Sequence, residues 1–202
     1  MTSMLDDVFR RLADPQFQDL GAGLMSFPAY VYVYPPEREY EFREAVSELP
    51  ERLRRPNVGQ EPLLVNVYEE LLSFLEDQTL GGRPLLNHIL EREEEAPEMV
   101  SRQIKQQATS GAFIQGLADQ FEEHVSEDGE RNRSYILVDG WGSVHPYLRS
   151  SKFLDLMEGR IGDYKLILFY PGTYEDGQFR LFGTLPSNRV YRASYLNEML
   201  ES

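Results

Sequence analysis

The chain has 202 residues, of which 41% are hydrophobic and 27% charged, a composition ordinary for a globular protein. It contains no cysteine, which excludes disulfides, thiolate nucleophiles, iron–sulfur clusters and cysteine-bound zinc. Its first residues include Asp6 and Asp7 and contain no apolar segment of the kind found in signal peptides, so we expect no signal peptide. No run approaches the about 18 apolar residues of a membrane helix, and we expect a cytoplasmic protein.

The net charge of -14 is unevenly distributed along the chain. Residues 1–130 carry 26 acidic and 11 basic side chains, whereas residues 131–202 carry 8 acidic and 9 basic ones. A protein that binds nucleic acid alone needs a basic surface, so only the last third permits such contact. Acidity of this kind also simply keeps a protein dissolved, and the charge by itself names no partner.

The first predicted elements alternate between helix and strand. An amphipathic helix is predicted over 3–12, and a strand rich in β-branched and aromatic residues over 30–34. A charged helix over 37–55 with apolar residues at helical spacing follows. The next strand and helix are predicted over 63–67 and 68–77.

Residues 80–128 are predicted to be helical throughout, as an elaboration of the domain. Apolar side chains recur there every four residues, at Phe113, Leu117, Phe121 and Val125, which indicates a buried helix face.

The last third contains two short apolar runs that we predict to be strands, over 135–139 and 165–170, separated by a helix over 146–157. The second run is predicted to end in a turn at Pro171 and Gly172. A β-hairpin or meander over 178–185 and 189–195 and a short terminal helix complete the prediction.

This alternation predicts an α/β fold for residues 1–202 as a single domain. We expect a mainly parallel sheet with helices on both faces and a helical insertion in the middle. The last strands have connections too short for a crossover, so we expect an antiparallel carboxyl-terminal edge.

Few residues carry an identifiable chemistry. Ile136 to Asp139 resembles a Walker B strand, but the chain contains no Walker A loop. His145 stands at a predicted helix start, where a histidine suits a general base, an anion ligand or a ring that holds a tight turn. The other two histidines lack partners at metal-binding spacing, so we expect no metal, no cofactor and no catalytic residue.

Trp141, the only tryptophan, lies between two glycines. It is either exposed as an interface anchor, with Arg149 and Arg192 nearby as polar contacts, or folded back onto the core. Strands 135–139 and 165–170 are expected to be parallel, which brings their carboxyl ends to one edge.

The candidate docking residues at this edge are therefore Trp141, His145, Arg149, Gly172 and Arg192. If they are exposed, their substitution changes stability by less than about 1 kcal/mol.

Several motifs in this region together resemble the BrxB family, a component of bacterial BREX phage-defence systems. They are Leu137-Val-Asp-Gly-Trp-Gly-Ser-Val144, Pro146-Tyr-Leu-Arg-Ser150, Leu168-Phe-Tyr-Pro-Gly-Thr-Tyr174, Leu181-Phe-Gly183 and Tyr191-Arg-Ala193. One departure is Trp141, where the family pattern suggests a smaller apolar residue.

The resemblance implies a subunit without a defined enzymatic activity. It also implies neighbours: a methyltransferase, a large ATPase and PglZ, an alkaline-phosphatase-like protein that is the favoured partner. Two alternatives stay open. One is a degenerate nucleotide-binding or phosphoryl-transfer enzyme with a site near Asp139, His145, Arg149 and Gly172, and the other a subunit that contacts nucleic acid. A concave site joining the first three residues favours chemistry, and a flat surface with exposed aromatic rings favours docking.

Overall fold

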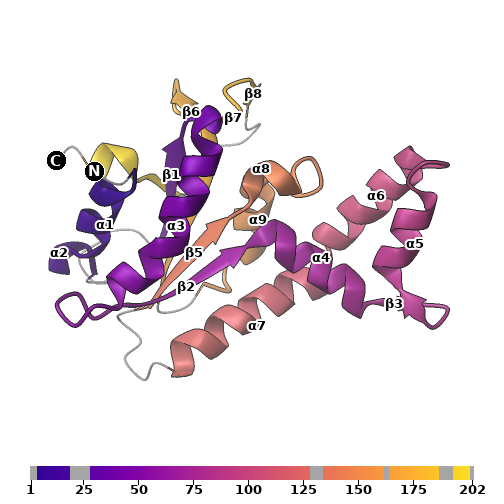
Figure 1. The fold of residues 1–202 in the computed structure, drawn as a ribbon, viewed down its shortest axis with the longest axis horizontal. Helices are drawn as coiled ribbons and strands as arrows, with labels where there is room; N and C mark the ends of the chain where they lie inside the picture. Colours follow the sequence, from indigo (N-terminus) through magenta and orange to yellow (C-terminus); the bar gives the residue numbers. More distant parts are fainter. Residues whose placement is uncertain (1–3, 19–27, 128–133, 162–163, 187–192, 201–202) are drawn as a thin grey trace.

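The computed structural model describes residues 4–18, 28–127, 134–161, 164–186 and 193–200. A parallel sheet forms its centre, with the strand order β2-β5-β6-β1-β9 (Figure 1). The bounds of these strands are β1 Ala29–Tyr34, β2 Glu61–Asn66, β5 Ser134–Asp139, β6 Lys165–Glu175 and β9 Ser194–Tyr195.

β5 is the strand that positions the candidate site, and it is buried along its whole length. It pairs in parallel with β2 on one side, Ile136 opposite Leu63, and with β6 on the other, Ile136 opposite Leu166. The carboxyl ends of these neighbouring strands therefore meet at one edge, as predicted.

Alternating side chains of the strands face two separate layers of helices. Tyr32, Leu137 and Phe169 contribute to a cluster that α1 Asp6–Leu12, α2 Pro15–Gln18 and α3 Glu39–Leu53 cover. The strand residues next to these in sequence, such as Val31, Val138 and Leu168, belong to the cluster on the opposite face of the sheet. The helices of that face are α4 Val67–Asp77, α5 Leu85–Arg92, α6 Pro97–Ala108, α7 Gly111–Glu127, α8 Trp141–Val144 and α9 Ser150–Met157. The predicted α/β fold with helices on both faces is confirmed.

The inserted region is mostly helical: α5 and α6 extend away from the sheet, at the right of Figure 1, and α7 runs back beneath it. The region differs from the prediction at its start, where β3 Thr79–Leu80 and β4 Arg83–Pro84 form a small antiparallel hairpin. Gly81 and Gly82 have φ angles of +62° and +82°, which glycine adopts without steric cost, and this pair allows the tight turn.

The carboxyl-terminal strands also differ in detail. The predicted turn at Pro171 and Gly172 is wrong, because β6 continues through both residues and pairs antiparallel with β7 Gln178–Leu181. β8 Leu185–Pro186 continues this antiparallel extension. Ser194 and Tyr195 pair in parallel with β1 instead of joining a meander, and residues 189–192 lie outside the described part of the chain.

Two short 3-10 helices, η1 Pro36–Arg38 and η2 Asn197–Met199, complete the described chain. The single helix predicted over 146–157 is α9 alone, preceded by the four-residue α8. Within the residues that the structure describes, no helix combines the length and the apolar character needed to cross a membrane.

Candidate functional site at the carboxyl edge of the sheet

Three polar side chains mark the carboxyl ends of β1, β2 and β5: Tyr34, Asn66 and Asp139. Asn66 and Asp139 are register partners. The Asn66 side-chain oxygen accepts hydrogen bonds from the backbone N–H groups of Tyr68 and Glu69 at 3.1 and 3.2 Å, which caps α4. The cap fixes Asn66, so this amide serves the fold.

Asp139 is the most perturbed acid of this edge. The residue is only 7% exposed, and its Oδ1 atom accepts no hydrogen bond from the described residues. Burial raises the pKa of Asp139 to about 6, and the negative charges of Glu69 and Glu39 add to the shift while Arg43 opposes it. A carboxyl group of this kind exchanges its proton near neutral pH.

A short chain of polar contacts links α3 to α8 at the same edge. The Tyr34 hydroxyl donates to Glu39 Oε2 at 2.7 Å, and Arg43 Nε donates to Glu39 Oε1 at 2.9 Å. Arg43 Nη2 also reaches Ser143 Oγ at 3.5 Å. Burial and the Glu39 contact raise the pKa of Tyr34 far above its usual value, so the phenol stays protonated.

Trp141 lies in the core, at 2% exposed. Its indole N–H donates to the Val138 carbonyl at 3.2 Å, and its ring packs against Phe153 with centroids 5.2 Å apart. The expectation of an exposed anchor is therefore wrong for Trp141, and the alternative, a ring folded onto the core, is right. Gly140, with φ +82°, makes the sharp reversal possible, since a Cβ there would come within 2.4 Å of Asn66 Oδ1.

His145 is partly buried beside Phe182, which was not among the candidate docking residues. The Phe182 ring meets the His145 ring edge-on, with centroids 6.4 Å apart. Partial burial and the neighbouring Arg149 charge lower the pKa of His145, so the imidazole is neutral at pH 7.

Phe182 is 43% exposed and has a φ of +54°. Its N–H donates to the Pro171 carbonyl at 3.0 Å, which holds this turn against β6. In the sequence, Phe182 belongs to the Leu181-Phe-Gly183 motif of the family resemblance and to the predicted segment 178–185, and neither marked it as a docking residue.

The remaining predicted residues lie in different environments. Gly172 is buried within β6, where a Cβ would come within 2.1 Å of the Arg180 carbonyl oxygen, so it serves strand packing. Arg149 is exposed immediately before α9, and Arg192 lies outside the described residues. We name the surface formed by His145, Arg149 and Phe182 the docking edge.

Arg149 also borders a hollow of about 340 Å³. The hollow is lined by Lys105, Thr109, Pro146, Tyr147, Arg149 and Lys152. Asp139 and His145 do not line it, so the three residues proposed for a catalytic site do not share this concave surface. Over the described ranges, no three His, Asp or Glu side chains are grouped in a way that could hold a metal ion.

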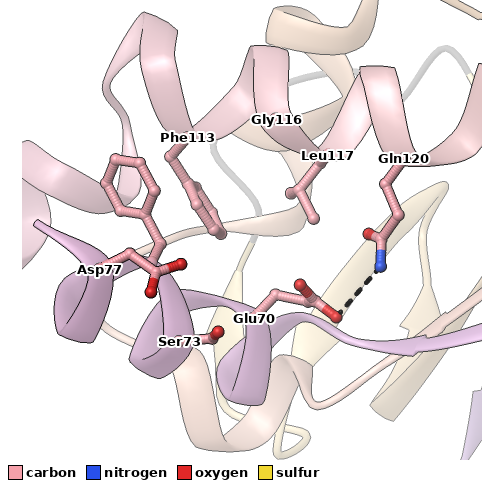
Figure 2. Close-up of a pocket in the computed structure, with 8 residues that line it drawn as sticks. Glu70, Ser73, Asp77, Phe113, Gly116, Leu117 and Gln120 are labelled. Carbon is pink, nitrogen blue, oxygen red and sulfur yellow. Dashed lines mark hydrogen bonds between the residues drawn. The ribbon is translucent and has the colours of Figure 1, made fainter.

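A second hollow, of about 270 Å³, lies between α4 and α7 and has the opposite charge. Figure 2 shows the carboxylates of Glu70 and Asp77 on α4, across from Phe113 and Leu117 on α7. The Gln120 amide donates to Glu70 Oε1 at 3.4 Å across this gap. The hollow between α4 and α7 thus contains acidic side chains, whereas the hollow beside Arg149 contains basic ones.

Comparison with known proteins gives a consistent family. The family model described as "BREX protein BrxB" matches residues 63–196. A protein named BREX protein BrxB from Bacillus cereus (strain H3081.97) is 22% identical over 195 residues, which cover 95% of each chain. A protein of the same name from Escherichia coli O9:H4 (strain HS) is 21% identical over 164 residues, covering 81% of this chain and 75% of the relative. No solved structure gives a significant match. The chain belongs to the BrxB family of BREX proteins.

Proposed function

We propose that this chain is a non-catalytic interaction subunit of a BREX phage-defence system. It acts in the cytoplasm and docks on PglZ, the alkaline-phosphatase-like component, through the docking edge. Family membership supports the assignment to BREX, since the matching relatives carry the name BREX protein BrxB. The choice of PglZ follows from the resemblance described above.

The observation that carries the docking proposal is the conformation of Phe182. A bulky residue with positive φ is uncommon and costs on the order of 1–3 kcal/mol of strain. At Phe182 this strained backbone conformation places a large ring partly in solvent, beside the neutral ring of His145. Half-exposed aromatic rings are typical anchors of protein interfaces.

Arg149 gives the docking edge its polar component. It is exposed and close enough to His145 to influence that ring's pKa. An arginine beside aromatic rings can form a bidentate contact with a carboxylate of a partner, which adds specificity to the apolar contact.

Phe182→Gly tests this proposal sharply because it separates folding from binding. Glycine relieves the strain of the positive φ, which offsets the lost packing of the partly exposed ring, so the melting temperature is expected to change little. The removed ring weakens capture of co-expressed PglZ by roughly thirtyfold, equivalent to about 2 kcal/mol. Arg149→Glu is expected to weaken capture in the same way. Pull-down of the tagged chain with quantified PglZ gives the measurement.

Leu90→Ser is the matched control, since Leu90 is 58% exposed on α5, away from the docking edge. This variant is expected to capture PglZ as the parent chain does. Folded Phe182→Gly and Arg149→Glu proteins that retain full capture would refute the docking edge.

A phosphoryl-transfer or nucleotide-binding activity near Asp139 is the second candidate, favoured by its buried carboxyl group with a raised pKa. Asp139→Asn distinguishes the two functions. Loss of phage protection in a plaque assay, with unchanged PglZ capture, would assign chemistry to this residue; unchanged protection would remove this candidate.

A further inference from the structure

The basic hollow is unusual in a chain of net charge -14. It gathers Lys105, Arg149 and Lys152, and so contains two of the chain's three lysines. None of its lining residues is acidic. Within the described part of the chain no carboxylate forms an ion pair with these three cations.

The three cations come from different places in the fold. Lys105 lies in the last turn of α6, Arg149 immediately precedes α9, and Lys152 lies in the first turn of α9. Arg149 occupies the N-cap position of α9 and makes no side-chain capping bond. Because Arg149 and Lys152 both line the hollow, the positive end of the α9 dipole adjoins it. Mutual repulsion of three cations is offset when an anion lies among them.

The remaining lining residues indicate what else such an anion carries. Tyr147 is half-buried and Pro146 is exposed, and both present apolar surface beside the cations. A volume of about 340 Å³ is at the small end of ligand pockets, which suits a single compact ligand. The net charge of -14 opposes an extended polyanion, which needs many cations along its backbone.

We propose that this hollow binds a phosphate-bearing ligand of mononucleotide size. Lys105, Arg149 and Lys152 hold the phosphate, and the planar base lies against the ring of Tyr147. The site is separate from the Phe182 anchor of the docking edge and shares only Arg149 with it, so its existence does not depend on the proposed function.

The test is titration calorimetry at low salt with AMP and with inorganic pyrophosphate as probes. Lys105→Glu and Lys152→Glu are each expected to weaken AMP binding at least about tenfold, because each reverses a charge at the phosphate. Arg55→Glu is the matched control, with the same charge change on an exposed residue outside the hollow, and retains the parent affinity within about twofold.

Tyr147→Ala separates the base from the phosphate. It is expected to weaken AMP binding and leave pyrophosphate binding unchanged, since only AMP has a base to stack. Equal affinity for the two probes, with no effect of Tyr147→Ala, would overturn the proposal of a nucleotide ligand and would indicate a site that binds phosphate alone. Absence of binding, or binding unchanged in both lysine variants, would overturn the site.

The two proposals fail separately. Lys105 and Lys152 lie outside the docking edge, so their variants retain PglZ capture even when they lose AMP. Phe182→Gly retains AMP binding even when capture is lost.

Discussion

Asp139 places a carboxylate charge in the protein interior at neutral pH, where Arg43 only partly offsets the cost of burial. Its pKa is about 6 in the folded protein against 3.8 as the ordinary value, so the unfolded chain loses the proton first as pH rises. Below pH 3.8 both states are protonated and stability is unaffected. Between about pH 4 and 6 stability falls, and above pH 6 the full cost of roughly 3 kcal/mol is present.

Asp139→Asn is therefore expected to raise the free energy of unfolding at pH 8 by as much as about 3 kcal/mol, with little effect at pH 4. Urea unfolding at a series of pH values measures this. The exposed Asp77→Asn serves as control for the loss of one negative charge. If Asp139→Asn raised the free energy of unfolding equally at every pH, burial of the Asp139 charge would not be the cause.

Trp141 is predicted to be a major stabilising residue of the edge. Trp141→Ala removes a fully buried ring and its hydrogen bond to Val138, and is expected to cost about 3–5 kcal/mol in the free energy of unfolding. Trp141→Phe retains most of the volume and costs less. Denaturant unfolding of both variants checks this, and a loss below about 1 kcal/mol in Trp141→Ala would indicate an exposed ring after all.

At the scale of elements, the antiparallel extension of β6 depends on a glycine. Gly172 lies opposite Leu181, and a Cβ at residue 172 would meet the backbone of β7 at 2.1 Å. The two strands must separate to accommodate it. Gly172→Ala is therefore expected to destabilise the protein by about 1–3 kcal/mol, measured by urea unfolding.

Gly116→Ala is the natural comparison for this substitution. Gly116 lies in α7 with nothing within 4 Å of its would-be Cβ, so alanine there is expected to stabilise by about 0.5–1 kcal/mol. If both substitutions moved stability in the same direction, backbone clash would not be the cause at Gly172.

The elements themselves were largely predictable, because each has a local pattern. Tyr30 to Tyr34 alternates between the two faces of β1, and Phe113 to Val125 recurs at helical spacing, so burial is encoded in neighbouring residues. The Pro171-Gly172 pair is a turn signal by composition alone. It lies in a strand because Pro171 pairs with Tyr34 of β1 and Gly172 with Leu181 of β7, and these contacts are not local.

At the scale of the whole molecule, the charge predicts weak binding to duplex DNA. Residues 1–130 repel phosphate, and three cations in one hollow release few counterions. We expect no sub-micromolar affinity at roughly 150 mM salt, and a shallow dependence on salt concentration. Fluorescence anisotropy with labelled duplex measures both; a sub-micromolar dissociation constant would contradict the prediction and favour a subunit that contacts nucleic acid.

The candidate site was only partly predictable. Parallel strands joined by a helix bring the residues after β5 to one edge, and that placement followed from chain order. Phe182 and Pro171 joined His145 there through the path of β6 and β7, which no local pattern specified.

By itself, the sequence determined the α/β class, the parallel central strands and the uneven charge, since these follow from composition and from periodicities within single elements. Only the tertiary structure decided that Trp141 is buried and Phe182 exposed, and that Lys105, Arg149 and Lys152 converge. An apolar ring after a strand fits either the core or an interface, and the choice depends on which distant side chains, here Phe153, leave space for it. Convergence of charges likewise depends on how helices far apart in the chain pack together.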